Sequence, residues 1–295
     1  MLGFACICNT LKDNGSFRTV TVKTLSKLNE EEKLKKLISL AVDNLYNTLQ
    51  ILKWCKENNI LMYRFSSDLI PLATYKEDWN WWENSDILNM CSKINAFVTE
   101  SGIRISLHPD QFCVLNSHRP EVVQNSIRIL EHLNRLSNLV GNKILIIHIG
   151  STVGGKENAL QRFLENFKLL SSDIQNKLAL ENDDKSFNAK EVLLICEALS
   201  IPMLLDIHHY NCLNEGENLF ELRDRIITTW KGKRPKMHLS SGKTNSIDRH
   251  HADYIKQVDY ETALDFAKSD FDIMLECKQK ELALLRLREC ENKSN

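Results

Sequence analysis

Residues 178–209, LALENDDKSFNAKEVLLICEALSIPMLLDIHH, contain two short apolar runs with a helix-like segment between them. The runs at 178–180 and 203–205 have the apolar content of buried parallel strands. Residues 189–199 repeat apolar side chains at the spacing of one helix face. Polar residues follow each run at once, beginning with Glu181 and Asp206. The stretch therefore predicts a right-handed βαβ unit with polar side chains at its strand ends.

The same alternation extends over the whole chain of 295 residues. Apolar runs predict strands at residues 3–8, 61–65, 103–107, 143–147, 178–180, 203–205, 235–239 and 272–275. Helical spacing predicts helices at residues 30–58, 86–101, 120–140, 157–175, 189–199, 217–229, 250–268 and 278–290. No linker rich in Pro, Gly or Ser divides the chain. Eight strands alternating with helices close most simply into one parallel barrel, so we predict an α/β protein with a single (β/α)8 TIM-barrel domain over residues 1–295.

The composition describes a folded chain without a strong overall charge. Lys and Arg number 38 and Asp and Glu 39, a net charge of −1, so no global basic field attracts a nucleic acid. Hydrophobic residues make up 43% of the chain, enough for a large core. No apolar stretch approaches the roughly 18 residues of a membrane span, and no signal peptide is recognisable. With nine scattered cysteines and no CxxC pair, we expect a cytoplasmic protein whose cysteines are mostly buried.

Polar residues of the kind that bind metals stand at or just after the predicted strand ends. They are Asn9, Ser66 to Asp68, His108, His148, Glu181 to Asp184, Asp206 with His208 and His209, Lys236 with His238, and Glu276. In a parallel barrel the carboxyl ends of the strands meet at one mouth, so these side chains are expected to converge. Carboxylates mixed with imidazoles match a site for two or three ions of Mn²⁺, Zn²⁺ or Fe²⁺. Lys236 shares a strand face with His238, and such ions would repel it unless it is deprotonated or modified.

Other features near these strand ends have alternative interpretations. Asp206 and His209 are expected in a loop, close enough together to reach one ion. The basic residues Lys231, Lys233, Arg234, Lys236, Lys243 and Arg249 are either merely solvated or suited to an anionic polymer beside the metal site. The aromatic residues Tyr75, Trp79, Trp81 and Trp82 either pack under a loop or stack on bases. His118, His132 and His250 are expected on the surface of helices or loops.

Ordered sequence blocks carry a resemblance to a known family. They are Gly3-Phe4-Ala5-Cys6, Arg64-Phe65-Ser66-Ser67-Asp68-Leu69-Ile70-Pro71, His108-Pro109-Asp110-Gln111-Phe112, His148-Ile149-Gly150, Leu180-Glu181-Asn182-Asp183, Asp206 to His209, Arg234-Pro235-Lys236-Met237-His238-Leu239-Ser240, His251-Ala252-Asp253 and Glu276-Cys277-Lys278. On these blocks the chain resembles the UV damage endonucleases, which are metal-dependent barrel repair enzymes similar in architecture to endonuclease IV. The resemblance extends over essentially the whole chain.

The resemblance implies a set of metal ligands. They are His108, His148, Glu181, Asp206, His209, His238, His251 and Glu276. It implies two or three divalent ions, with Mn²⁺ as the first choice and Zn²⁺ or Fe²⁺ as alternatives. It also implies that Lys236 is carboxylated on its amine, which would make it an anionic ligand. On this basis we expect catalytic roles for Lys236, Glu181 and Glu276.

Four residues are expected to contact DNA or the lesion: Asn9, Gln111, Phe112 and Tyr75. The resemblance places Gln111 and Phe112 where the family inserts side chains into the duplex, and Asn9 where an asparagine contacts the damaged nucleotides. Tyr75 stands where the family usually has a histidine in a Pro-x-x-Ser/Thr-His stretch, which leaves the number of ions open.

The expected activity is hydrolysis of the DNA phosphodiester immediately 5′ to UV photoproducts, which leaves 3′-hydroxyl and 5′-phosphate ends. The expected partner is UV-damaged double-stranded DNA, and we expect a monomer without a membrane or nucleotide cofactor. Two alternatives remain. A divalent-metal sugar isomerase would also place His, Glu and Asp at barrel strand ends, and turnover of a free sugar would identify it. A non-catalytic damage-binding or metal-storage barrel would bind irradiated duplex without cutting it.

Overall fold

The computed structural model describes residues 1–75 and 79–294, and in that part of the chain eight strands are present. They are β1 (Leu2–Ala5), β2 (Met62–Arg64), β3 (Arg104–Ser106), β4 (Leu145–His148), β5 (Leu178–Glu181), β6 (Met203–Asp206), β7 (Lys236–Leu239) and β8 (Asp272–Leu275). They form one sheet in the order β3-β2-β1-β8-β7-β6-β5-β4, in which neighbouring strands are parallel. The predicted strands are therefore confirmed.

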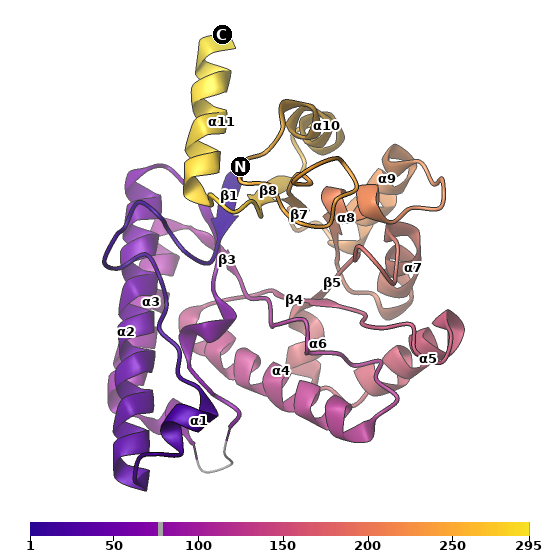
Figure 1. Ribbon diagram of the computed structural model, residues 1–295. Coiled ribbons are helices and arrows are strands. Elements are labelled where there is room, and N and C mark those ends of the chain that lie inside the picture. Colours follow the sequence, from indigo (N-terminus) through magenta and orange to yellow (C-terminus); the bar gives the residue numbers. More distant parts are fainter. Residues whose placement is uncertain (76–78, 295) are drawn as a thin grey trace.

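The sheet closes into a barrel between its two outer strands, β3 and β4. Leu107, just after β3, forms a parallel bridge with Leu145. Its N–H donates to the carbonyl of Ile144 at 3.1 Å, and its own carbonyl accepts from the N–H of Ile146 at 2.9 Å. Figure 1 shows the strands around a common centre with α2, α3, α4, α7 and α9 outside them. This arrangement confirms the (β/α)8 TIM barrel.

The described helices follow the predicted order. They are α1 (Val22–Leu25), α2 (Glu30–Glu57), α3 (Ser85–Ser101), α4 (Pro120–Val140), α5 (Lys156–Phe167), α6 (Ser172–Lys177), α7 (Ala189–Leu199), α8 (Ile207–Cys212), α9 (Leu219–Thr229), α10 (Gln257–Ala267) and α11 (Glu281–Ser294), with short 3₁₀ turns at Ser67–Leu69 and Trp81–Glu83. The longest, α2, starts with a reciprocal capping box between Asn29 and Glu32. Its inner face buries apolar side chains from Leu37 to Cys55, which fixes the helix on the barrel.

Local backbone and capping contacts changed two of the expected helices and one expected loop. The helix predicted over 157–175 is divided into α5 and α6, because Ser171 caps a new helix by accepting from the N–H of Ile174. The helix predicted from residue 250 begins only at Gln257, because His251 instead forms a bridge with Gly242. The loop expected between Asp206 and His209 is the first turn of α8.

The aromatic cluster after β2 is mainly a packing feature. Trp79 and Trp81 are 4% and 0% exposed, so neither offers a face to a base. His132, expected at the surface, is only 8% exposed and packs edge-on against Trp81 at 5.1 Å between ring centroids. The prediction for His132 was wrong because α4 turns this residue towards the 79–82 segment. Tyr75 is half-buried against the core.

The basic segment around β7 is divided between the two ends of the barrel. Residues 231–234 precede β7 and lie at its amino end, whereas Lys243 and Arg249 follow it and lie at its carboxyl end. These basic residues therefore do not form one patch beside the strand ends. Six of the nine cysteines are buried, as expected. Within residues 1–75 and 79–294, no helix has the length and apolar character needed to cross a membrane.

Candidate metal centre

The first group of possible metal ligands gathers around Glu181, the last residue of β5. Its carboxylate is 1% exposed, and one oxygen lies 3.0 Å from Nε2 of His108 and 3.7 Å from Nε2 of His148. His148 ends β4, the strand beside β5, and His108 follows β3, on the other side of β4. The barrel closure thus brings residues from three neighbouring strands to one carboxylate.

The second group joins Glu181 to Asp206 and His209. Asp206 ends β6 and caps α8, because its side chain accepts from the backbone N–H of His209 at 2.9 Å. The first turn of α8 therefore brings the His209 ring back over the strand ends. The second carboxylate oxygen of Asp206, Oδ2, is buried without a hydrogen-bond partner. Such an oxygen is costly unless it has a ligand.

The third group consists of Glu181, His238 and Glu276. Nδ1 of His238, on β7, lies 2.7 Å from one oxygen of Glu181 and 2.9 Å from one oxygen of Glu276, just after β8. Arg64, the last residue of β2, also contacts Glu276. In each of the three groups the ligand atoms lie within 4.8 Å of one another, and Glu181 belongs to all three.

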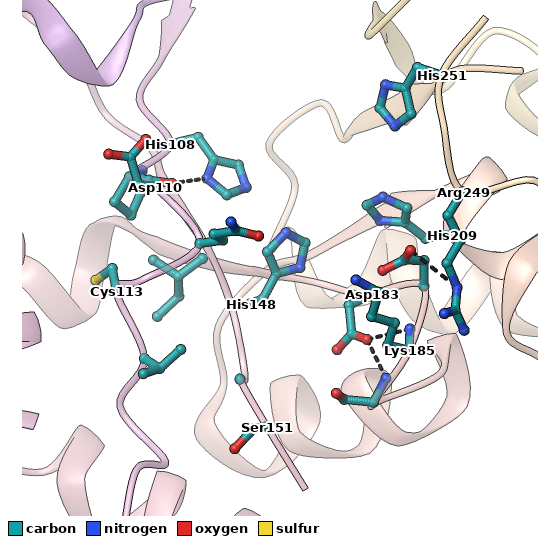
Figure 2. Close-up of a pocket in the computed structure, with 17 residues that line it drawn as sticks. His108, Asp110, Cys113, His148, Ser151, Asp183, Lys185, His209, Arg249 and His251 are labelled. Carbon is teal, nitrogen blue, oxygen red and sulfur yellow. Dashed lines mark hydrogen bonds and ion pairs between the residues drawn. The ribbon is translucent and has the colours of Figure 1, made fainter. Parts of the chain in front are cut away.

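Four histidine rings are oriented by backbone carbonyls. Nδ1 faces the carbonyl of Pro109 in His108 (2.7 Å), of Glu181 in His148 (3.2 Å), of Asn182 in His209 (2.9 Å) and of Glu276 in His251 (2.6 Å). A carbonyl only accepts, so Nδ1 carries the hydrogen in each ring and Nε2 is the nitrogen that could bind an ion; in His108 this Nε2 contacts Glu181 at 3.0 Å. This is the usual arrangement of metal-binding histidines. Figure 2 shows the same four rings facing one shared space.

Burial and charge perturb the ionisation of these residues strongly. Burial alone would lower the pKa of His238, but Glu181 and Glu276 outweigh it and raise that pKa to about 10. The pKa of His209 is raised to about 9 by its carboxylate neighbours, against the effect of burial. Burial would raise the pKa of Glu181, but the charges of His238 and His148 hold it well below its usual range. The carboxylates are thus balanced by protons that binding ions would displace.

This donor set fits divalent ions. Buried carboxylates and imidazoles are the ligands of Mn²⁺, Zn²⁺ and Fe²⁺ sites. The unpartnered Oδ2 of Asp206 is an oxygen that a cation would satisfy. Because Glu181 belongs to all three groups, it would help to hold an ion bound in any of them.

His251 and Lys236 lie outside the three groups. His251 lines the same cavity, and its ring centroid is 6.4 Å from that of His209. Lys236 begins β7, and its buried amine donates to the carbonyl of Ile105 at 3.0 Å. Burial, together with the charge of Arg104, lowers the pKa of Lys236 to about 7. Its amine thus lies nearer the amino end of the barrel than the ligand groups do, and its carboxylation stays a prediction.

The four residues expected to contact DNA lie at different distances from the cavity beside the ligand groups, and only one of them lines it. His108, His148, His209 and Gln111 line one cavity of about 440 Å³. Phe112, next to Gln111 in the loop after β3, is 73% exposed. Asn9 is exposed in the loop after β1, where the neighbouring Thr10 N–H donates to Glu281 at 2.7 Å. Tyr75 does not line this cavity.

Sequence reasoning named three further residues that shape the centre but did not predict their contacts there. Arg64 is the charged partner of Glu276. Its position at the end of a predicted strand was the feature of the sequence that could have indicated this contact. Asn182 is buried, and its side chain forms two hydrogen bonds to the backbone of Asp206, at 2.8 and 2.9 Å. Arg249 lines the cavity and lies 3.4 Å from Asp184, a contact that spacing in the sequence cannot indicate.

Comparison with known proteins agrees with this geometry. The profile of one family, described as UV-endonuclease UvdE, matches residues 1–294. The chain belongs to this family. The UV DNA damage endonuclease of Bacillus thuringiensis subsp. konkukian (strain 97-27) is 35% identical to this UvdE-family chain over 293 residues, which are 96% of this chain and 92% of that protein.

Two solved structures extend the comparison. The crystal structure of SacUVDE aligns with this UvdE-family chain at a TM-score of 0.87 and 34% identity, and the alignment covers 98% of both chains. Endonuclease IV from Thermus thermophilus aligns at a TM-score of 0.60 and 14% identity, with 84% of this chain and 94% of that one covered. The second likeness shows the fold alone. The resemblance drawn from the sequence blocks is thereby confirmed.

Proposed function

We propose that this chain is a metal-dependent endodeoxyribonuclease that hydrolyses the DNA phosphodiester immediately 5′ to UV photoproducts and so initiates excision repair. The proposed substrates are duplexes with pyrimidine dimers, 6-4 photoproducts or other distorting lesions, and the products carry 3′-hydroxyl and 5′-phosphate ends. The observation that carries the proposal is the sharing of Glu181 among three ligand groups, two of which supply histidines to one cavity. Membership of the UvdE family favours DNA over a sugar as substrate.

The residues proposed to hold two or three ions are His108, His148, Glu181, Asp206, His209, His238, His251 and Glu276. Mn²⁺ is the first choice, and Zn²⁺ or Fe²⁺ are the alternatives. Such ions supply an activated water and neutralise charge that develops on the phosphate. They also give a positive mouth to a protein whose net charge is −1.

The chain's own side chains hold the site in one arrangement. Backbone carbonyls fix the histidine rings with Nε2 available. Asn182 fixes the backbone of Asp206, which restricts where that carboxylate points. Arg64 orients Glu276 and lowers the pKa of that carboxyl, so that Glu276 stays ionised despite its burial. A site held this rigidly loses little entropy when phosphate and ions arrive.

Lesion recognition is proposed to depend on how easily damaged DNA deforms. A crosslinked pyrimidine pair is already partly unstacked, so bending or flipping it costs less than deforming intact duplex. Phe112, 73% exposed in the loop after β3, is available as a wedge between bases. Gln111 and Asn9 are the polar contacts proposed beside it, and Tyr75 is the fourth proposed DNA contact.

A nicking assay tests the proposed activity. Purified protein with Mn²⁺ is incubated with an end-labelled duplex that carries one defined photoproduct, and the break is mapped at nucleotide resolution. We expect one break, directly 5′ to the lesion. Glu181→Gln should reduce its rate by at least about 100-fold, because Glu181 belongs to every ligand group. Glu197→Gln, which alters an exposed ion pair with Arg225, is the control.

The same assay separates the alternatives. Binding of irradiated duplex without cleavage would support a non-catalytic damage-binding barrel. Turnover of a free sugar with Mn²⁺ and no cleavage would support a sugar isomerase. Near-normal nicking by Glu181→Gln would exclude the proposed metal centre. A mass increase equal to one CO₂ on the peptide that contains Lys236 would support its carboxylation and its role as a ligand.

The remaining proposals concern the whole chain. We propose that residues 1–295 form one domain that acts as a monomer, without a nucleotide cofactor, in the cytoplasm. Sedimentation of the protein with and without a lesion duplex tests the monomer.

A further inference from the structure

A second, larger cavity lies at the opposite end of the barrel from the metal centre. It has a volume of about 780 Å³. Its lining comes from residues at the start of β3 and just before β4 and β7, together with parts of α3, α4 and α6. No role has been derived for this end of the barrel.

This second cavity, called the lower cavity below, has mostly basic residues among its charged lining residues. They are Arg104, Lys143, Lys177, Lys233, Arg234 and Lys236, and a single acid, Asp173, lines it with them. Asp173 is already engaged, because Lys177 donates to it at 2.6 Å. The neighbouring Asp272 is also engaged: it accepts from Arg234 at 2.7 Å and from Arg104. The chain's net charge is only −1, so this concentration of positive charge is local.

Three of these lysines lack a carboxylate partner among residues 1–75 and 79–294. Lys143 and Lys233 are exposed at the rim, and no ion pair of either is present in that part of the chain. Lys236 is 1% exposed and uses one of its three N–H donors, towards Ile105. If Lys236 is carboxylated, Lys143 and Lys233 still lack a counter-charge.

The remaining walls of the lower cavity are apolar. Val98, Ile103, Ile144 and Trp230 contribute to them, and the indole N–H of Trp230 is already bonded to the carbonyl of Met203 at 2.7 Å. The apolar walls favour a hydrocarbon or ring, and the basic residues favour a negative charge. We propose that the lower cavity binds an organic anion, with its apolar body against the half-buried Ile144 and its anionic group among the lysines and arginines. This site is separate from the proposed nuclease function.

Calorimetric titration of the metal-loaded protein with naphthalene-1-sulfonate tests this proposal. The sulfonate combines an apolar ring with a permanent charge and is a weak metal ligand. We expect saturable binding with a Kd below about 1 mM. The neutral analogue 1-naphthol should bind at least about tenfold more weakly, because it lacks the charge.

Variants locate the binding. The double variant Lys143→Ala/Lys233→Ala should weaken sulfonate binding at least about tenfold, while its thermal unfolding stays close to wild type because both side chains are exposed. Lys231→Ala removes an exposed lysine from the same turn as Lys233 that does not line the cavity, and should bind as the wild type does. Absence of saturable binding, equal binding of 1-naphthol or an unchanged Kd in the double variant would overturn the proposal.

Discussion

Replacing Asp206 with Asn is expected to stabilise the metal-free protein and to weaken metal binding. One carboxylate oxygen of Asp206 accepts from the N–H of His209, and Asn preserves this bond. The other oxygen, Oδ2, is buried without a hydrogen-bond partner and lies 3.9 Å from Nδ1 of His209. The ligand atoms of Asp206 and Glu181 lie within 4.8 Å of each other. An amide removes one of these two neighbouring negative charges and offers a donor in place of an unsatisfied acceptor.

The size of both effects follows from the contacts. A buried unsatisfied polar atom costs about 1–3 kcal/mol, so the metal-free variant should gain about 1 kcal/mol of unfolding free energy. For a chain of this size the gain corresponds to a Tm increase of about 2–4 °C. Loss of a charged ligand should weaken ion binding at least about tenfold, which removes about 1.4 kcal/mol of the stabilisation that saturating metal provides.

Thermal unfolding in EDTA and in excess MnCl₂ measures the two effects separately. Wild type, Asp206→Asn and Asp184→Asn are compared, because Asp184 lines the same cavity without belonging to a ligand group. Asp206→Asn should unfold at a higher temperature in EDTA and show a smaller shift with Mn²⁺, while the Mn²⁺ shift of Asp184→Asn stays that of wild type. A lower Tm in EDTA together with an undiminished Mn²⁺ shift would show that Asp206 is not a ligand.

Three further predictions concern DNA contact and folding. Phe112→Ala should slow nicking at a lesion about tenfold without changing Tm, because the ring of Phe112 is 73% exposed. The control, Phe220→Ala on α9, should leave the nicking rate unchanged. Equal nicking rates for Phe112→Ala and wild type would exclude a wedge role. Arg249→Gln should raise KM for the duplex several-fold and lower the slope of log KM against log salt concentration by about one, and an unaltered slope would exclude a phosphate contact. Burial and Arg135 lower the pKa of His132 to about 3. Below a pH of about 6.5, His132 is therefore protonated in the unfolded chain but not in the native state. The free energy of unfolding consequently falls as the pH falls. Relative to His132→Gln, wild type should lose about 2 kcal/mol more unfolding free energy between pH 7.5 and 5, measured by denaturant titration, and parallel losses would contradict this.

The barrel was predictable because its signal is repeated along the chain. Each strand is a short apolar run followed by polar residues, as at 178–180, and the helices repeat apolar side chains at their own spacing. Closure could not be read in the same way. It depends on the bridge between Leu107 and Leu145 and on the pairing of β1 with β8, whose residues lie near opposite ends of the chain. No local pattern in the sequence indicates either contact.

Most residues of the three ligand groups could be named from the sequence, but the geometry of the groups could not. The positions of Glu181 and Asp206 at predicted strand ends indicated that both belong to the site, because parallel strands place their carboxyl ends at one mouth of the barrel. The spacing could not indicate that Glu181 belongs to all three groups, since this depends on side-chain rotamers across the barrel. The turn of α8 was also missed: a six-residue helix has too little periodicity to detect, and its signal is the capping bond from His209 to Asp206.

Lys236 and His238 show that the two-residue repeat of a strand predicts which face a side chain lies on but not which site it belongs to. Two residues apart on β7, both side chains face the barrel interior, as the sequence predicts. The period of two says nothing about height along the barrel axis, and a separation of two residues is about 6–7 Å on a strand. His238 therefore reaches Glu181 and Glu276 at the carboxyl end, while the amine of Lys236 reaches Ile105 and lines the lower cavity. One strand thus contributes an imidazole to the ligand groups and an amine to the opposite end of the barrel.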